Sequence, residues 1–177
     1  EQQDALTSRG ITVTVGDATS EDDMKQCITE AKEHGEINGL LHCVGSIVIR
    51  PPHALNKDAF EDVITTNLTS AFLALSIAGK AMLRQGSGRM VFSSSVAGSL
   101  GLVNHEAIAA AKGGIEAMVR ASAATYARRG LRINAVAPGL TDTKMASKIL
   151  SSDAMRETAA QKIPTQRINK KEEAASA

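Results

Sequence analysis

The chain alternates between two patterns of hydrophobic and polar residues. Short apolar runs rich in β-branched residues are typical of buried strands, whereas longer segments with apolar residues at helical spacing are typical of helices. The first pattern predicts strands at 11–15, 39–44, 89–93 and 131–136. The second predicts helices at 1–8, 21–34, 56–84 and 104–128. Asn56 and Asn104 are expected to cap the two long helices at their N-termini.

This alternation favours an α/β fold. Buried strands that alternate with helices form doubly wound parallel sheets with helices on both faces. A length of 177 residues with 43% hydrophobic content is enough for one core, and no linker or repeat divides the chain. We therefore expect one domain over 1–177, with ligand-binding loops at the carboxyl ends of the strands.

Composition excludes several classes of protein. A net charge of +1 with both signs scattered, and 2% aromatic residues, argue against nucleic-acid binding. The apolar runs are too short to span a bilayer and no signal peptide opens the chain, so a cytoplasmic location is the default expectation and no membrane partner is expected. Cys27 and Cys43 have neither disulfide-framework density nor metal-ligand spacing, so no metal is expected.

A serine and a lysine carry the candidate chemistry. Ser95 follows a predicted strand, and Lys112 lies seventeen residues later in a predicted Ala-rich helix. This arrangement resembles the short-chain dehydrogenase/reductase family, in which a Ser is followed thirteen residues later by a Tyr and then, after four more, by a Lys. Ile108 stands at the Tyr position. The resemblance implies a partial Rossmann-like sheet and hydride transfer between NAD or NADP and a carbonyl or alcohol substrate.

The missing tyrosine leaves two functions open. In the family the serine polarises the carbonyl, the tyrosine transfers the proton, and the lysine binds the nicotinamide ribose and lowers the pKa of the phenol. Ile108 transfers no proton, and general acid-base catalysis contributes roughly 10²- to 10⁴-fold. The chain is therefore either an oxidoreductase with impaired or altered proton transfer, or a non-catalytic nucleotide-binding or scaffold protein.

Two residues are considered as replacements for the tyrosine. Tyr126 lies fourteen residues past Lys112, about 21 Å along a helix, and is too distant. His105 shares a helix face with Ile108 and Lys112, and an imidazole with a reference pKa of about 6.5 is a plausible acid. The favoured alternative is that His105 is a partly exposed residue beside the Asn104 cap.

Residues after the first two predicted strands match cofactor positions of the family. Asp17, followed by Ala18, stands where the family places a carboxylate that accepts a hydrogen bond from the adenine amino group, although an ordinary turn is an equal alternative. Gly45 keeps the glycine of an Asn-Asn-Ala-Gly motif beside the adenosine ribose. His42 and Cys43 replace the asparagines, and we expect them to be packing residues.

Two further sites extend the resemblance. Asn67 matches a family asparagine that sits inside a helix and helps to carry a water-linked proton path from the lysine, and Asn is otherwise a mediocre helix former. After the last predicted strand, Pro138, Gly139, Thr141 and Thr143 match the family's nicotinamide-side motif. There the Thr141 amide and the Thr143 hydroxyl would hold the carboxamide.

The resemblance covers only the middle of the family's domain. The chain contains no Gly-rich turn of the kind that binds the pyrophosphate at the start of that domain. We therefore expect an internal portion of a longer domain, without its first two strands and its last; the alternative is a short protein that closes its sheet differently. In the family the two long helices pair with their copies, so the resemblance implies a homo-dimer or homo-tetramer acting on a small molecule.

Overall fold

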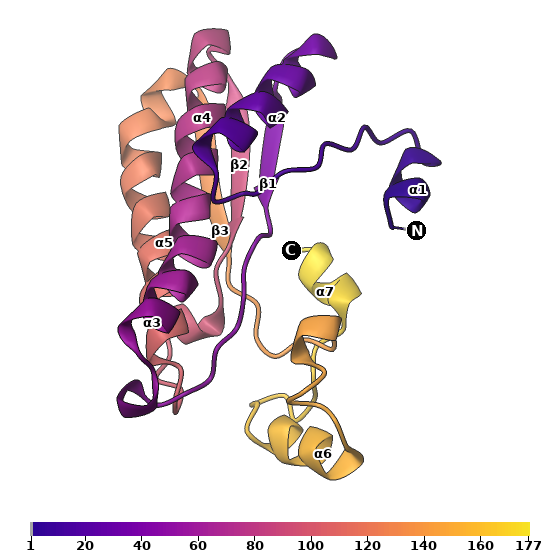
Figure 1. The fold of residues 1–177 in the computed structure, drawn as a ribbon, viewed down its shortest axis with the longest axis vertical. Helices are drawn as coiled ribbons and strands as arrows, with labels where there is room; N and C mark the ends of the chain where they lie inside the picture. Colours follow the sequence, from indigo (N-terminus) through magenta and orange to yellow (C-terminus); the bar gives the residue numbers. More distant parts are fainter. Residues whose placement is uncertain (1) are drawn as a thin grey trace.

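A three-stranded parallel sheet forms the centre of the protein. The computed structural model describes residues 2–177, and Glu1 of the predicted first helix lies outside the described residues. Leu40 pairs with Met90, which pairs in turn with Ile133. The strands lie side by side in chain order (Figure 1): β1 (Gly39–His42), β2 (Gly88–Ser93) and β3 (Leu131–Val136). The predicted α/β class and parallel sheet are confirmed.

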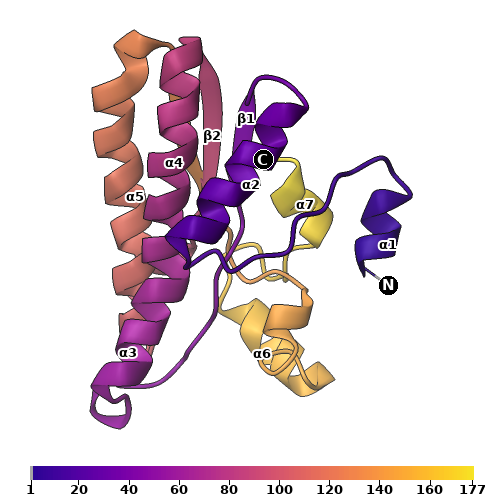
Figure 2. The same ribbon diagram turned by 45° about the horizontal axis from the view of Figure 1, so that its top comes forward.

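The predicted helices form within a few residues of their expected bounds. The α-helices of the described residues are α1 (Gln2–Thr7), α2 (Glu21–Glu33), α3 (Lys57–Ile64), α4 (Ser70–Gln85), α5 (Glu106–Tyr126), α6 (Asp153–Gln161) and α7 (Lys171–Ala175). A π-helical turn at Thr65–Thr69 joins α3 to α4, so the predicted helix at 56–84 is continuous but not α-helical throughout. Figures 1 and 2 both place α4 and α5 against the sheet and α1 and α6 away from it.

The helices α4 and α5 cover one face of the sheet. Met90, Phe92 and Ile133 point to this face and are 0%, 0% and 4% exposed. On the opposite face Leu41 is 70% exposed, and Arg132 is exposed as well. The sequence predicts helices on both faces of the sheet. Within residues 2–177 they cover only one face. Right-handed crossovers that advance in the same direction across a sheet bring their helices to the same face.

The predicted strand at 11–15 is wrong. The segment forms no ladder with any described strand, and Figure 1 shows it running between α1 and α2 outside the sheet. Val15 is 80% exposed. The Thr14 hydroxyl donates to the Glu30 carboxylate at 2.5 Å. This side-chain hydrogen bond does not pair the backbone of the segment with a strand. A strand needs a neighbour for its backbone groups, and β-branched residues alone do not supply one.

Of the two predicted N-caps, one forms. The Asn56 side chain accepts a hydrogen bond from the Ala59 N–H at 2.9 Å, so this cap is confirmed. Asn104 instead has φ +62°, and His105 is the residue that precedes the first turn of α5. The cap at Asn104 is wrong because this residue turns the chain in the left-handed conformation, which Asn tolerates better than most residues.

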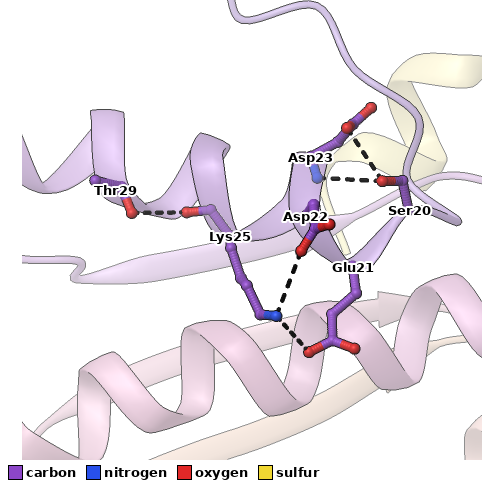
Figure 3. A network of polar contacts seen from close by, with 6 residues as sticks. All are labelled: Ser20, Glu21, Asp22, Asp23, Lys25 and Thr29. Carbon is purple, nitrogen blue, oxygen red and sulfur yellow. Dashed lines mark hydrogen bonds and ion pairs between the residues drawn. The ribbon is translucent and has the colours of Figure 1, made fainter.

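Polar contacts fix the start of α2 (Figure 3). The Ser20 hydroxyl accepts a hydrogen bond from the Asp23 N–H at 3.2 Å and caps the helix. Lys25 forms ion pairs with Glu21 at 2.7 Å and with Asp22 at 3.5 Å. Negative side chains in a first turn also interact favourably with the helix dipole. These local contacts define where α2 begins, directly after the loop that carries Asp17.

The helical run Lys57–Gln85 is long and apolar enough to cross a membrane by length and composition alone. Its most apolar window is 44% buried in this structure, and α4 forms part of the sheet's core. A core helix passes the same test, so this feature is weak evidence for membrane insertion.

Candidate functional site

The candidate residues gather at one edge of the sheet. Gly45, Ser95 and Pro138 follow β1, β2 and β3, and the carboxyl ends of parallel strands share one edge. The loops after β2 and β3 are joined there, because the Val96 N–H donates to the Pro138 carbonyl at 3.1 Å. Lys112 reaches this edge from α5, where its ammonium donates to the Ser93 carbonyl at 2.8 Å.

Asn67 is fully buried within the π-helical turn. Its Oδ1 accepts from the Ser46 N–H at 3.2 Å, and its Nδ2 donates to Ser46 Oγ at 3.1 Å and to the Val63 carbonyl at 2.9 Å. π-Helical turns occur often at functional sites. The amide thus ties the loop after β1 to the long helix. Sequence reasoning missed Ser46, whose only signal was its place next to Gly45.

Gly45 is the point at which Asn67 and Lys112 converge. A Cβ atom at this position would lie 2.7 Å from Asn67 Oδ1 and 3.3 Å from Lys112 Nζ. The first distance is shorter than real Cβ contacts allow, so only glycine fits without a shift. The three residues, predicted separately, are therefore brought into one cluster.

Burial lowers the pKa of Lys112 below its ordinary value of 10.5, while the charge of Cys43 acts in the opposite direction. Burial does so because removing water from an ammonium favours its neutral form. The side chain is 7% exposed. The two N–H groups of Nζ that do not bond Ser93 are the ones that a ligand would use.

The stability of the protein is expected to depend on pH through Lys112. Between the lowered pKa of the folded chain and the ordinary value of 10.5, the unfolded chain binds more protons, so the free energy of unfolding rises with pH in this window. We expect wild type to gain stability relative to Lys112→Met as the pH rises toward 10.5. Urea unfolding of both proteins across this range measures the difference. A difference that does not change with pH would contradict the prediction.

Ser95 has an extended backbone and a hydroxyl that is free to donate. Its φ and ψ are −164° and 154°, and its Oγ accepts a hydrogen bond from the Ala97 N–H at 3.2 Å. This bond uses a lone pair and leaves the hydroxyl hydrogen available. The geometry therefore suits a serine that donates to a carbonyl oxygen.

Ile108 fills the tyrosine position with hydrocarbon. It is 4% exposed and packs in an apolar cluster with Val63, Ala97, Ala107 and Ala111. None of these side chains carries a proton that a substrate oxygen could take. The predicted defect in proton transfer stays a prediction, and it rests on this packed apolar side chain.

The His105 side chain contacts the backbone of its own loop. Its Nδ1 lies 2.7 Å from the Val103 carbonyl, so Nδ1 carries a hydrogen and donates. The Nε2 atom then bears a proton only when the ring is an imidazolium. A role for His105 as a replacement acid stays a prediction, and it requires the cationic ring.

His42 and Cys43 differ in their surroundings. His42 is 4% exposed and its ring centroid lies 5.9 Å from that of Phe92, as a packing residue's would. Among the described residues its two ring nitrogens have no hydrogen-bond partner. Burial, and secondarily the charge of Lys112, lowers the pKa of His42. Cys43 is exposed, so only one of the two expected packing residues is buried.

The remaining cofactor candidates lie in turns. Asp17 Oδ1 accepts from the backbone N–H of Thr19 at 2.8 Å and from its hydroxyl at 2.7 Å, and these bonds lower the pKa of Asp17. Ala18 lies inside this turn. The Thr141 hydroxyl donates to the Gly139 carbonyl at 3.0 Å, and Thr143 is exposed before a short helical turn. Their roles toward a cofactor stay predictions.

Comparisons with known proteins agree with this fold. A family model described as "Enoyl-(Acyl carrier protein) reductase" matches residues 1–177. The 2-(S)-hydroxypropyl-CoM dehydrogenase 3 of Xanthobacter autotrophicus is 35% identical over 92% of this chain and 66% of its own length. A short-chain type dehydrogenase/reductase structure from Mycobacterium ulcerans has a TM-score of 0.89 at 26% identity, over 99% of this chain and 65% of its own.

One further solved structure shares the fold. A gluconate 5-dehydrogenase from Burkholderia cenocepacia, in complex with NADP and tartrate, has a TM-score of 0.90 at 21% identity, over 99% of this chain and 70% of its own.

The parallel α/β sheet, with Ser95, the buried Lys112 and the buried Asn67 at its carboxyl edge, places the chain among the Rossmann-like proteins. The chain belongs to the short-chain dehydrogenase/reductase family. The predicted resemblance is thereby confirmed. The chain spans about two thirds of the length of the Xanthobacter and Mycobacterium relatives, at 66% and 65%.

Proposed function

We propose that this chain is part of an NAD(P)-dependent oxidoreductase that transfers a hydride between nicotinamide and a carbonyl or alcohol of a small molecule. The observation that carries this proposal is the convergence of Lys112 and Asn67 over Gly45 at the carboxyl edge of the sheet. Ser95 follows the neighbouring strand at the same edge. Family membership supports the same class of reaction.

The residues present fit a dinucleotide. The missing side chain of Gly45 lets Asn67 Oδ1 and Lys112 Nζ approach the backbone there, and the Lys112 ammonium has two N–H groups beyond its bond to Ser93. Lys112 would hold the ribose hydroxyls, and Gly45 would lie beside the adenosine ribose. The NADP complex of the Burkholderia gluconate dehydrogenase supports the choice of cofactor.

The other proposed cofactor contacts lie in the turns after the strands. Asp17 and Ala18 would contact the adenine at the start of α2. The segment with Pro138, Gly139, Thr141 and Thr143 would hold the carboxamide after β3.

The chain's own residues would supply two functions that carbonyl reduction needs, polarisation of the carbonyl by Ser95 and orientation of the cofactor by Lys112. Lys112 would hold the cofactor, whose nicotinamide would supply the hydride for the new C–H bond at the carbonyl carbon. The Ser95 hydroxyl donates to the carbonyl oxygen and stabilises its developing negative charge. Lys112 orients the ribose, and its positive charge favours the same oxyanion. The oxygen must also gain a proton, and Ile108 has none to give.

Cofactor binding tests the proposal. NADPH and NADH are titrated into this chain, and into the longest natural polypeptide that contains it, with nicotinamide fluorescence as the signal. We expect one cofactor to bind, and Lys112→Met to weaken binding about 10- to 100-fold because charge-assisted hydrogen bonds are lost. Binding of neither cofactor by either polypeptide would contradict the proposal.

A second candidate is a non-catalytic nucleotide-binding or scaffold protein. The observation that favours it is Ile108, which is buried among apolar side chains where the family has its acid. Such a protein would reduce no carbonyl substrate, both as wild type and as Ile108→Tyr, and in its nucleotide-binding form it would still bind the cofactor.

We also propose that the protein forms a homo-oligomer through the outer surfaces of α4 and α5. Phe72 on α4 is 56% exposed. A groove of about 460 Å³ runs beside it, and Leu83 and Tyr126 lie in its lining. Pairing of such helices across a two-fold axis would cover these apolar groups.

A cytoplasmic location stays a prediction.

A further inference from the structure

A single carboxylate holds the loop that carries Ser95 against α5. Glu116 lies one helical turn after Lys112 on α5. Its Oε1 accepts a hydrogen bond from the Ser94 hydroxyl at 2.9 Å, and its Oε2 accepts one from the Ser99 hydroxyl at 2.7 Å. The two serines lie on either side of Ser95 in the sequence. Both oxygens of the carboxylate are therefore bonded to the loop, one at each end of it.

The loop approaches α5 without a side chain between them. A Cβ atom on Gly98 would lie 2.9 Å from Glu116 Oε1, from the Gly113 nitrogen and from the Lys112 carbonyl carbon. Such short distances leave room for glycine only. The turn after Ser95 thus lies directly on the helix turn that carries Lys112, and Glu116 bonds the two together.

The bonding pattern spares the hydroxyl of Ser95. Ser94 is 4% exposed and has a second acceptor, the Lys112 carbonyl at 3.1 Å. One hydroxyl hydrogen serves one acceptor at a time, and the charged and nearer Glu116 oxygen is the stronger partner. The Ser95 hydroxyl accepts a hydrogen bond from the Ala97 N–H, and it donates neither to Glu116 nor to the Lys112 carbonyl. Glu116 therefore fixes the loop through the flanking serines and leaves Ser95 free to donate.

We propose that Glu116 is a positioning residue that sets Ser95 relative to Lys112. Its effect on turnover rests on the proposed function, whereas its hold on the loop does not. Without the carboxylate, Ser94 turns to the Lys112 carbonyl and Ser99 loses its partner. The loop then moves away from α5 more often, and Ser95 spends less time where a substrate oxygen would lie.

Hydrogen exchange tests the hold on the loop in this chain itself. We expect the amides of Gly98 and Ser99 to exchange about tenfold faster in Glu116→Ala than in wild type, because two hydrogen bonds are lost. Glu116→Gln is expected to restore slow exchange, since its amide accepts from one serine and donates to the other. Equal exchange in wild type and Glu116→Ala would overturn the proposal.

Two further variants keep this test decisive. Glu106→Ala removes a glutamate from the same helix without touching either serine, so its loop amides are expected to exchange as in wild type. Ser99→Ala removes one of the two bonds at an exposed position and serves if Glu116→Ala does not fold. Unchanged exchange at Gly98 in Ser99→Ala would then overturn the proposal.

Kinetics separate positioning from a purely structural role. In the Ile108→Tyr background, Glu116→Ala is expected to lower kcat for a ketone about tenfold, with the Kd for NADPH unchanged because Lys112 stays in place. Glu116→Gln is expected to recover kcat. If Glu116→Ala binds the cofactor normally and its kcat is unchanged, the positioning role is contradicted.

Failure of the proposed function has a different signature. The longest natural polypeptide that contains this chain would then bind no cofactor. The difference in amide hydrogen exchange between Glu116→Ala and Glu116→Gln would persist.

Discussion

Ile108→Tyr is expected to raise the turnover of a ketone with NADPH by about 10²- to 10⁴-fold. The substitution places a phenol on α5 one turn before Lys112, whose ammonium would lower the pKa of the phenol toward neutrality. The restored acid would then supply the proton that the carbonyl oxygen needs. NADPH oxidation is followed by its absorbance, with a panel of ketones, in the longest natural polypeptide that contains this chain.

The tyrosine has to enter a packed environment. Ile108 is 4% exposed and contacts the cluster that includes Val63 and Ala97. Overpacking a core costs about 1–3 kcal/mol, so we expect a lower free energy of unfolding in the same variant. The new tyrosine can transfer a proton to the substrate only if its hydroxyl lies beside that of Ser95.

Ile108→Phe is the matched control. It brings the same ring and the same crowding, but no hydroxyl, so it is expected to lose stability to the same degree and to gain no turnover. A gain in both variants would show that shape and not proton transfer limits the reaction. No gain in either, with cofactor bound, would favour the non-catalytic alternative.

Gly45→Ala is expected to destabilise the protein by about 1–3 kcal/mol. Its Cβ would lie 2.7 Å from Asn67 Oδ1, which is fully buried and accepts the Ser46 N–H. Either the loop or the asparagine must move, and the hydrogen bonds between them weaken. For a chain of this size the expected fall in Tm is roughly 2–4 °C per kcal/mol, measured by thermal unfolding.

Gly101→Ala separates this clash from the general effect of replacing a glycine. A Cβ at Gly101 meets no atom within 4 Å, so its stability is expected to stay within about 0.5 kcal/mol of wild type. Gly45→Ala should also weaken NADPH binding, while Gly101→Ala should not. Equal stability of the two variants would contradict the close approach at Gly45.

Some expectations from the sequence depended on neighbours that a single segment cannot specify. The segment 11–15 has the composition of a strand, yet it forms none because strand identity requires a pairing partner. Asn104 has the chemistry of a cap, but its backbone takes the left-handed conformation and His105 stands before the helix. Helix and strand propensities are local quantities, whereas pairing and capping depend on the fold around them.

The sequence by itself determined the family, the candidate residues, and the order of the three paired strands and of the helices between them. Hydrophobic periodicity predicts which positions are buried. The spacing from Ser95 to Lys112 matches the family's motif, and this match can be recognised without a structure. It also showed that Ile108 lacks a proton to give. These properties depend on residue type and on short separations along the chain.

Only the tertiary structure decided which of these residues act together. It brought Asn67 and Lys112 over Gly45, and it placed Glu116 between two serines that lie seventeen and more residues before it. It also placed α4 and α5 on one face of the sheet. Such contacts join residues far apart in the sequence, and their geometry follows from the packing of helices on the sheet, which no local pattern encodes.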